Sequence, residues 1–187
     1  MPKKVDHDVY RAELAHRAAP LFSEHGYSGL GMRAVAEALG VSKSALYHYF
    51  PTKRDLFLAC TAAVTELSEP TELVGPVPEQ LLGLAAELRP GFGAEMALLF
   101  DYLRGMDAET VAADPAMRLA LERFEQWVAR VAGAEHARAA LAFITGALLL
   151  EHFSGGRWPV DEVRRGLDAL LDPRRADPSA GPDIGAR

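Results

Sequence analysis

The chain has 187 residues, of which 49% are hydrophobic and 25% are charged, and its formal net charge is −6 at pH 7. This is the composition of an ordinary soluble protein, and the length is enough to bury one large core or two small ones. The single cysteine, Cys60, excludes an internal disulfide and a cysteine-based metal site. We expect Cys60 to be a small buried hydrophobic residue, and the sequence leaves a redox role open.

The N-terminal residues do not form a secretory signal, because no apolar core follows Lys3 and Lys4. No uninterrupted apolar run reaches the length of a bilayer span. We therefore expect a cytoplasmic protein that has no membrane partner. A first helix is predicted from about Asp8 to His25, since apolar residues recur at helical spacing along it and Gly26 follows.

The next stretch, Gly31 to Phe50, reads GMRAVAEALGVSKSALYHYF and predicts a helix-turn-helix. Ala36 is small enough to let a second helix approach, and Gly40 can adopt the positive φ that ends the first helix in a tight turn. Ser42 can cap the second helix by accepting a backbone N–H. Leu46 points into the joint, which leaves four side chains of the second helix exposed: Lys43, Ser44, Tyr47 and His48.

Several short motifs resemble the TetR family of transcriptional regulators. They are HGY at 25–27, the helix-turn-helix itself, LYHYF at 46–50 and the K-x-x-L at 53–56, and together they cover about the first third of the chain. The resemblance implies an all-helical homodimer that binds operator DNA and releases it when a small molecule enters the C-terminal domain. It implies nothing about the identity of that molecule, because the rest of the chain diverges freely within the family.

We predict that the exposed side chains of the second helix face the major groove of DNA, where lysine and tyrosine can contact base edges. Tyr49 is expected to face the DNA backbone, and Ser42 lies at the start of the same helix. Arg33, in the first turn of the preceding helix, is either a phosphate contact or a solvated side chain. The free N–H groups at that helix start can also meet a phosphate, although Gly31 lacks the usual capping hydroxyl.

A connecting helix is predicted to begin at Lys53, with Thr52 as its cap and Asp55 as the acidic partner of the cap. A lysine is unfavourable at the positive end of a helix, so Lys53 indicates an external anion. The resemblance agrees, since this position is a phosphate contact in similar proteins.

The charges are divided along the chain in a way that suits a protein with one DNA-binding end. Residues 1–54 contain eight Lys and Arg against five Asp and Glu, whereas the remainder contains twelve against twenty-one. A modestly basic head on an acidic body can bind phosphates with one end only. We expect a DNA-binding domain over residues 1–52, an effector-binding and dimerisation domain over 53–172, and a disordered tail over 173–187.

Further helices are predicted at about 79–88, 93–106, 114–131, 135–153 and 160–171. The segment 135–153 has more apolar residues than one core-facing stripe needs, and 160–171 has a clear apolar stripe of its own. Because one recognition helix reads too few base pairs, we expect a homodimer that uses both helices in a four-helix interface.

The C-terminal part also contains an excess of large, flexible and aromatic side chains, which is typical of a small-molecule pocket. We predict that an apolar or amphipathic effector binds among the helices at 93–106, 114–131 and 135–153, near the connecting helix. Taken one by one, these side chains are more often part of a packed core, and we expect only a subset of them to line the cavity. The candidate ligand contacts are Val64, Phe92, Met96, Phe100, Phe124, Trp127 and Phe143.

Other function classes find little support in the sequence. The six histidines do not show metal-binding spacing, and there is no nucleophile elbow or phosphate-binding loop, so we expect no catalytic site, no metal and no cofactor. The main alternative is an all-helical dimer whose helix-turn-helix binds a protein partner. Steep weakening of binding with salt would favour DNA over that alternative.

Overall fold

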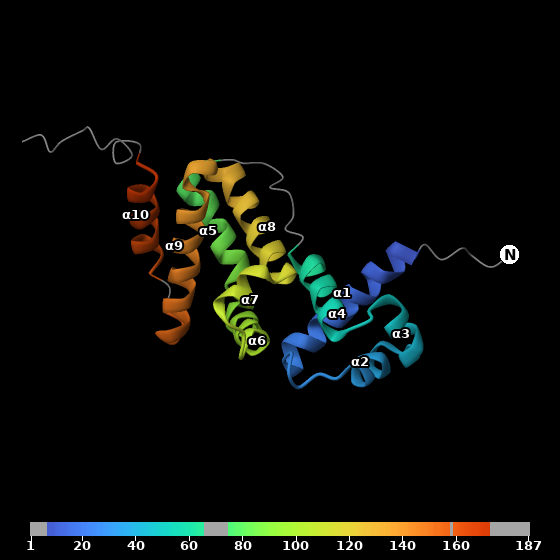
Figure 1. The fold of residues 1–187 in the computed structure, drawn as a ribbon. Coiled ribbons are helices and arrows are strands. Elements are labelled where there is room, and N and C mark those ends of the chain that lie inside the picture. The colour runs from blue at the N-terminus through green and yellow to red at the C-terminus, as the bar shows by residue number, and fades with distance from the viewer. Residues whose placement is uncertain (1–6, 66–74, 158, 173–187) are drawn as a thin grey trace, which may run out of the picture. The chain divides into compact units, whose positions relative to one another are not determined.

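The protein is described by a computed structural model over residues 7–65, 75–157 and 159–172 (Figure 1). Within these ranges the structure is helical and contains no strand, as the sequence predicted. The helices are α1 His7–His25, α2 Met32–Leu39, α3 Lys43–Tyr49, α4 Lys53–Val64, α5 Val77–Leu88, α6 Phe92–Leu103, α7 Ala108–Ala113, α8 Pro115–Ala132, α9 Ala134–Phe153 and α10 Val160–Leu170.

Every helix expected from the sequence is present, and α7 is an additional one. Asp107 caps α7 by accepting the amide of Thr110 at 2.8 Å. The sequence signal for this helix was only six residues long, which is too short for periodicity to reveal. The tail expected over residues 173–187, and Lys3 and Lys4, lie outside the described residues. Among the helices that are described, none combines the length and hydropathy of a membrane span.

The chain divides into two compact units, which are described separately. The first comprises residues 1–68 and 91–124, and the second comprises 69–90 and 125–187. In the first unit α4 packs along α1, so the connecting helix shares its core with α1 to α3. The boundary that we expected after residue 52 stays a prediction; by packing, the whole of α4 groups with α1 to α3, and so do α6, α7 and the first part of α8.

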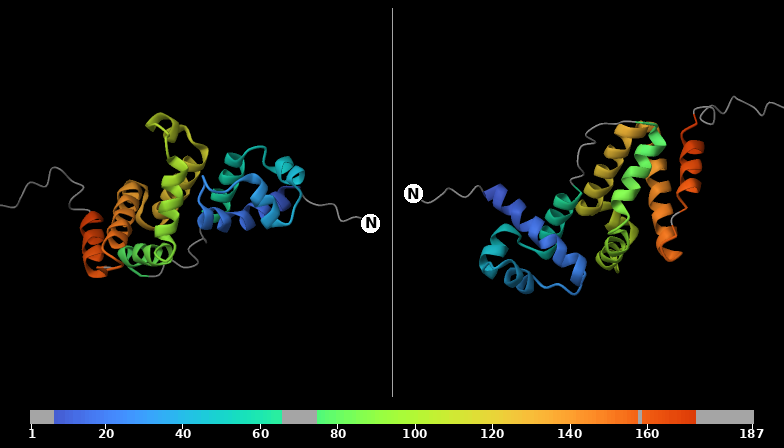
Figure 2. Two further views of the ribbon diagram at one scale, coloured as in Figure 1. Left: turned by 90° about the horizontal axis from the view of Figure 1, so that it is seen from below. Right: turned by 180° about the vertical axis from the view of Figure 1, so that it is seen from behind.

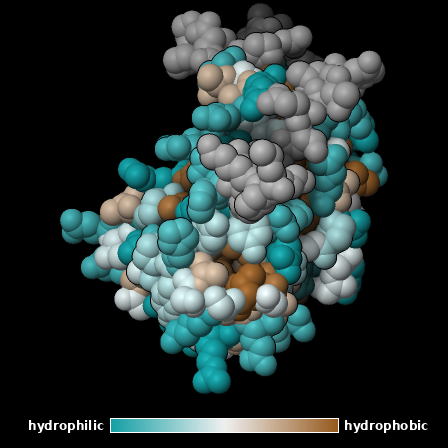
Figure 3. All heavy atoms as spheres, turned by 90° about the vertical axis from the view of Figure 1, so that its right-hand side faces the viewer, coloured by the Kyte–Doolittle hydropathy of each residue, from teal (hydrophilic) through white to brown (hydrophobic). Residues whose placement is uncertain are grey.

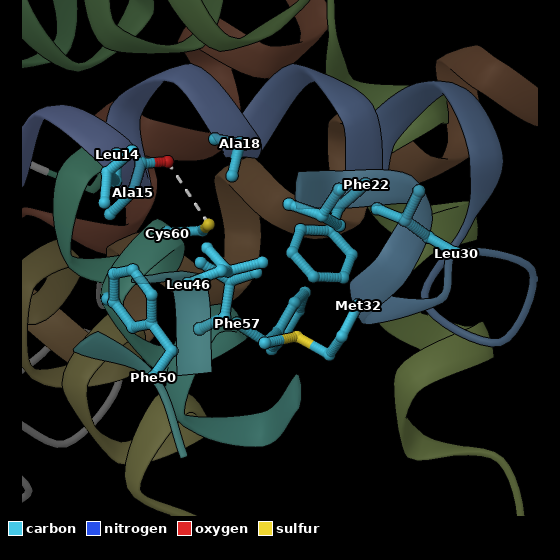
Figure 4. Packing of buried hydrophobic residues seen from close by; sticks show 14 of the residues in the cluster. Leu14, Ala15, Ala18, Phe22, Leu30, Met32, Leu46, Phe50, Phe57 and Cys60 are labelled. Carbon is cyan, nitrogen blue, oxygen red and sulfur yellow. Dashed lines mark hydrogen bonds between the residues drawn. The ribbon is translucent and has the colours of Figure 1, made fainter. Parts of the chain in front are cut away.

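The core of the first unit is built from residues of α1 to α4, as Figure 4 shows. Phe22 from α1, Leu46 from α3 and Phe50 at the end of α3 are each almost completely buried. Cys60 lies among them, and its Sγ donates a hydrogen bond to the carbonyl of Ala15 at 3.2 Å. Burial raises the pKa of the Cys60 thiol to about 12, so the thiol stays protonated and packs as a small hydrophobic residue.

A buried carboxylate joins α4 to two further helices, α6 and α8. Asp114 is fully buried and caps α8, where its Oδ1 accepts the amides of Ala116 at 2.9 Å and Met117 at 3.1 Å. Its Oδ2 accepts the Tyr102 hydroxyl of α6 at 2.7 Å and pairs with the Arg54 guanidinium of α4. A buried charge is tolerated only when it is paired and hydrogen-bonded in this way.

In the second unit, α5, α9 and α10 pack against one another (Figure 2). Leu167 of α10 is completely buried in this packing. Gly166 allows Phe143 of α9 to lie against α10, since a Cβ at residue 166 would come within 2.1 Å of the Phe143 ring. Glu151 of α9 is nearly buried and accepts a hydrogen bond from Arg89 at 2.6 Å.

We predict that Asp114→Ala lowers the free energy of unfolding by about 2–4 kcal/mol, because it leaves Tyr102 and two helix amides without their acceptor. Arg54 adds little to this loss, since its side chain is 47% exposed and water can solvate it. Asp107→Ala is the matched control, because Asp107 also caps a helix but is exposed. Chemical denaturation of wild type and both variants should give Asp114→Ala a clearly lower free energy of unfolding than Asp107→Ala.

The stability difference between wild type and Asp114→Ala should also depend on pH. Burial raises the pKa of Asp114, but the hydrogen bonds from Tyr102, Arg54 and the two amides outweigh it and hold the pKa below its ordinary value. The stabilisation by Asp114 is therefore complete above the unfolded pKa of about 3.9 and is lost as the pH falls further. The difference between wild type and Asp114→Ala should narrow below about pH 4. A difference that stays constant down to pH 2 would contradict this assignment.

Candidate nucleic-acid interface

The turn between α2 and α3 has the geometry that the sequence predicted. Gly40 ends α2 in the left-handed region, with φ 69° and ψ 28°. Its amide donates to the carbonyl of Glu37 at 3.1 Å, and the amide of Val41 donates to that of Ala36 at 3.0 Å. The last carbonyls of α2 are thus satisfied within the turn, which directs the chain sharply into α3.

Both helix starts that follow are capped as expected. The Ser42 Oγ accepts the amide of Ala45 at 3.1 Å. Thr52 and Asp55 form a reciprocal capping box: the Thr52 Oγ1 accepts the amide of Asp55 at 3.1 Å, and the Asp55 carboxylate accepts that of Thr52 at 2.9 Å. These caps fix the entry angles of α3 and α4 in a short segment.

The side chains of α3 are sorted into two faces. Leu46 is completely buried, as is Phe50 directly after the helix, while Lys43, Ser44 and His48 are exposed and Tyr47 is 39% exposed. The predicted exposure of these four is therefore confirmed, and their contact with DNA stays a prediction. The Lys43 Nζ lies 5.6 Å from the centre of the Tyr47 ring, so both contribute to one polar surface. The face shown in Figure 3 is mostly hydrophilic, with a small hydrophobic patch.

Two arginines of α1 brace the helix-turn-helix, and sequence reasoning missed both. Arg17 donates to the Leu39 carbonyl at the end of α2, at 2.7 Å. Arg11 donates to the Tyr49 carbonyl at 3.4 Å, and its guanidinium lies 4.9 Å from the centre of the Phe50 ring. Cationic side chains at helix C-termini are favourable, so α1 stabilises both α2 and α3. Arg33 is exposed in the first turn of α2, where Gly31 provides no side-chain cap.

Lys53 has a partner inside the protein that the sequence did not predict. Its Nζ donates to the Tyr27 carbonyl at 2.8 Å and lies 4.4 Å from the centre of the Tyr27 ring. This contact accounts for a lysine at the start of α4 without an external anion. An ammonium has three donors, so two remain for a phosphate.

Tyr49 is half-buried and lies at the edge of the exposed face of α3. Its hydroxyl is 3.2 Å from the Nδ1 of His7, the first residue of α1. Its ring also contacts Tyr10 edge to face, with the ring centres 5.4 Å apart. The Tyr49 hydroxyl is therefore held at the surface by α1.

The seven candidate ligand contacts do not share one environment. Five belong to the first unit and two, Trp127 and Phe143, to the second. Phe92 and Trp127 are buried, whereas Phe100 and Val64 are 61% and 60% exposed; Met96, Phe124 and Phe143 are half-buried. Phe143 lines a pocket of about 820 Å³ between α9 and α10. The assignment of these residues to an effector stays a prediction. No three His, Cys, Asp or Glu side chains are grouped for a metal ion in the described ranges.

Comparison with known proteins gives matches to the N-terminal part. Residues 14–60 match the family described as bacterial regulatory proteins, tetR family. The helix-turn-helix transcriptional regulator YezE of Bacillus subtilis is 33% identical over 81 residues, which are 41% of this chain and 42% of YezE. The transcriptional repressor AcnR of Corynebacterium glutamicum is 45% identical over 49 residues, 26% of each chain. The chain thus spans less than half the length of these two curated relatives. Both relatives are regulators of transcription.

Solved structures match over most of the chain. The multidrug binding protein EbrR, in a complex with proflavin, has a TM-score of 0.62 at 22% identity and covers 86% of this chain and 98% of its own. Salmonella enterica GusR has a TM-score of 0.61 at 24% identity, over 90% and 99%. At these identities the likeness establishes a shared fold.

The cap of α3 gives a test of how this surface is held. We predict that Ser42→Ala lowers the free energy of unfolding by about 1 kcal/mol, because the Ala45 amide loses its acceptor. Ser44→Ala is the control: Ser44 lies two residues further on, its Oγ is 3.1 Å from that of Ser42, and the Ala45 amide donates to Ser42 instead of to Ser44. Urea denaturation should separate the two variants. Equal stabilities would mean that the Ser42 cap does not hold α3.

Proposed function

We propose that the chain belongs to the TetR family through its N-terminal domain. We further propose that the protein is therefore a DNA-binding regulator of transcription. The observation that carries the proposal is the sorting of α3 into a buried face and an exposed face of donors. A short helix held by a tight turn and offering such side chains fits the major groove of B-DNA. The protein acts as a repressor, as the relative AcnR is named.

Within this proposal the residues have different tasks. Lys43 and Ser44 at the start of α3, with Tyr47 and His48 one turn later, contact base edges. Tyr49, Lys53 and Arg33 contact the phosphate backbone, and Lys53 does so with the donors that Tyr27 leaves free. Ser42 caps the helix that carries the base contacts.

We further propose that the protein is a homodimer through α9 and α10. Leu150 and Phe153 of α9 are 69% and 73% exposed, which is unusual for large apolar side chains. They lie near the pocket between α9 and α10, whose walls are largely apolar or small: Ala142, Phe143, Gly146, Ala147, Leu150, Val163 and Gly166. A second copy of the same two helices covers this surface and spaces two α3 helices for two half-sites.

The DNA-binding state responds to a small apolar or amphipathic molecule. Support comes from the shared fold with EbrR, which is a multidrug binding protein solved with proflavin. An effector releases DNA only if it binds the DNA-incompetent state more tightly. A hundredfold release requires about 2.7 kcal/mol of differential affinity. The aromatic and apolar side chains of α6 and α8, among them Phe92, Met96 and Phe124, are the candidates to contact it.

The alternative is that the helix-turn-helix binds a protein. A fluorescence anisotropy titration against fragments of the native genome, at two salt concentrations, separates the two. Binding to DNA falls steeply with salt, because each neutralised phosphate releases counterions. Binding that does not depend on salt would favour the protein partner. Sequencing the bound fragments identifies the operator, and the neighbouring genes suggest the effector.

Two lysines give the test of the DNA contacts, because they are of the same type and lie ten residues apart on α3 and α4. Lys43→Ala should cost about 1–3 kcal/mol at particular base pairs and relax the specificity there. Lys53→Ala should weaken all sequences alike and reduce the salt slope by about 1. Anisotropy with the selected fragment and with scrambled duplexes measures both. If wild type and Lys53→Ala have equal affinity at low salt, the phosphate contact of Lys53 is refuted.

The dimer is tested by replacing an exposed residue, so that the fold of the protomer is kept. We expect Leu150→Asp to shift the mass measured by light scattering toward the 20.2 kDa of one chain and to weaken operator binding. Leu121→Asp is the control, since Leu121 is an exposed leucine, at 49%, on α8 and not on the two helices of the proposed interface. A wild-type mass of one chain at micromolar concentration would contradict the dimer.

A further inference from the structure

We infer that His7 is a further residue of the DNA-contacting surface, and that His7 and Tyr49, with His48 packed beside them, form a phosphate contact that strengthens as the pH falls. We call these three residues the His7 cluster. The inference rests on the proposed function, because it requires α3 to meet DNA. It adds a residue of α1 to a contact surface that is otherwise built by α2, α3 and the start of α4.

The geometry brings two exposed imidazoles and a phenol to one spot. The His7 Nδ1 is 3.2 Å from the Tyr49 hydroxyl, and the centres of the two rings are 5.8 Å apart. The His7 ring meets the His48 ring edge to face, with 6.0 Å between the centres. The His48 and Tyr49 rings are 5.2 Å apart, so each member of the cluster contacts the other two.

The position of the cluster explains why it can reach DNA. His48 belongs to the exposed face of α3 on which the DNA contacts are proposed, and Tyr49 follows it at the edge of that face. His7 is exposed at the first turn of α1 and is held at that edge by its contacts with both. A backbone phosphate that lies beside α3 therefore meets three polar groups at the same place.

Protonation changes what this cluster can offer. A neutral imidazole has one N–H and one acceptor nitrogen, whereas an imidazolium has two N–H donors and no acceptor. When His7 is protonated, its Nδ1–H donates to the Tyr49 oxygen, and the Tyr49 O–H is free to donate outward. Neutral His7 leaves only one outward donor, either the Tyr49 O–H or its own Nε2–H, whereas the imidazolium leaves both and adds a charge. Each of these changes favours a phosphate over water.

The surroundings do not already neutralise the added charge. The titratable and charged groups on the two helices next to the cluster are Asp8, Tyr10 and Arg11 on α1 and Lys43 and Tyr47 on α3. Asp8 carries a negative charge, while Arg11, Lys43 and the positive end of α1 are positive. Arg11 is engaged by the Tyr49 carbonyl and the Phe50 ring. An approaching phosphate tips this balance, and binding of DNA takes up a proton.

The test uses the whole protein and a duplex of random sequence at low salt, since phosphate contacts do not depend on sequence. Anisotropy titrations at pH 6 and pH 8 compare wild type, His7→Gln and His16→Gln. His16 is the matched control, because it is an exposed histidine of α1 that lies nine residues on, about half a turn around the helix. Thermal unfolding at both pH values shows that each variant is folded.

We expect the affinity of wild type and of His16→Gln to rise roughly fivefold from pH 8 to pH 6, which is about 1 kcal/mol. His7→Gln should lose most of that gain, whereas His16→Gln should match wild type at both pH values. The inference is overturned if His7→Gln keeps the wild-type dependence on pH, or if His16→Gln loses it equally. If no protein binds the duplex at either pH, the proposed function fails as well, which is a different result from binding that does not depend on pH.

Discussion

The burial of Leu46 and Phe50 between α1 and α4 is the constraint on which the outer surface of α3 depends. Both side chains are completely buried, and a helix of seven residues that buries one face has no freedom to rotate. The face that remains carries lysine, serine, tyrosine and histidine side chains. A protein that only needed a stable helical hairpin would gain nothing from this choice of residues, whereas a protein that binds DNA needs it.

The start of α4 is also fixed by several specific contacts. Thr52 and Asp55 close the helix start, Lys53 is bound to the Tyr27 carbonyl, and Arg54 reaches the buried Asp114. Asp114 in turn binds Tyr102 of α6 and caps α8. The four consecutive residues at the start of α4 thus connect this helix to the turn at Tyr27, to α6 and to α8. Because the Asp114 carboxylate is buried, removing Arg54 leaves a buried charge without its ion-pair partner. The stability lost in this way is larger than the stability that the intact pair contributes.

Local signals in the sequence predicted much of this arrangement. Gly40, Ser42 and the pair Thr52 and Asp55 act through neighbours within a few residues, so the turn and both caps could be predicted and are confirmed. Helix positions followed from the period of apolar residues, with the short α7 as the exception.

Contacts between residues far apart in the sequence could not be predicted in this way. Asp114 looks like an ordinary helix start, and only the fold brings Arg54 to it, sixty residues away. The same holds for Lys53 with Tyr27 and for His7 with Tyr49. The ligand residues were selected by size and aromaticity, which do not distinguish a packed side chain such as Trp127 from an exposed one such as Phe100.

We propose that α3 is the element that enters the major groove. Site-specific photo-crosslinking tests it most directly, with a benzophenone side chain in place of Tyr47 or, in a second protein, in place of Phe100. Both positions hold exposed aromatic residues, at 39% and 61%. Irradiation in the presence of a selected genomic fragment should crosslink position 47 to DNA bases, and position 100 should form no crosslink to DNA. Crosslinks from position 100 and none from position 47 would mean that α3 does not enter the major groove.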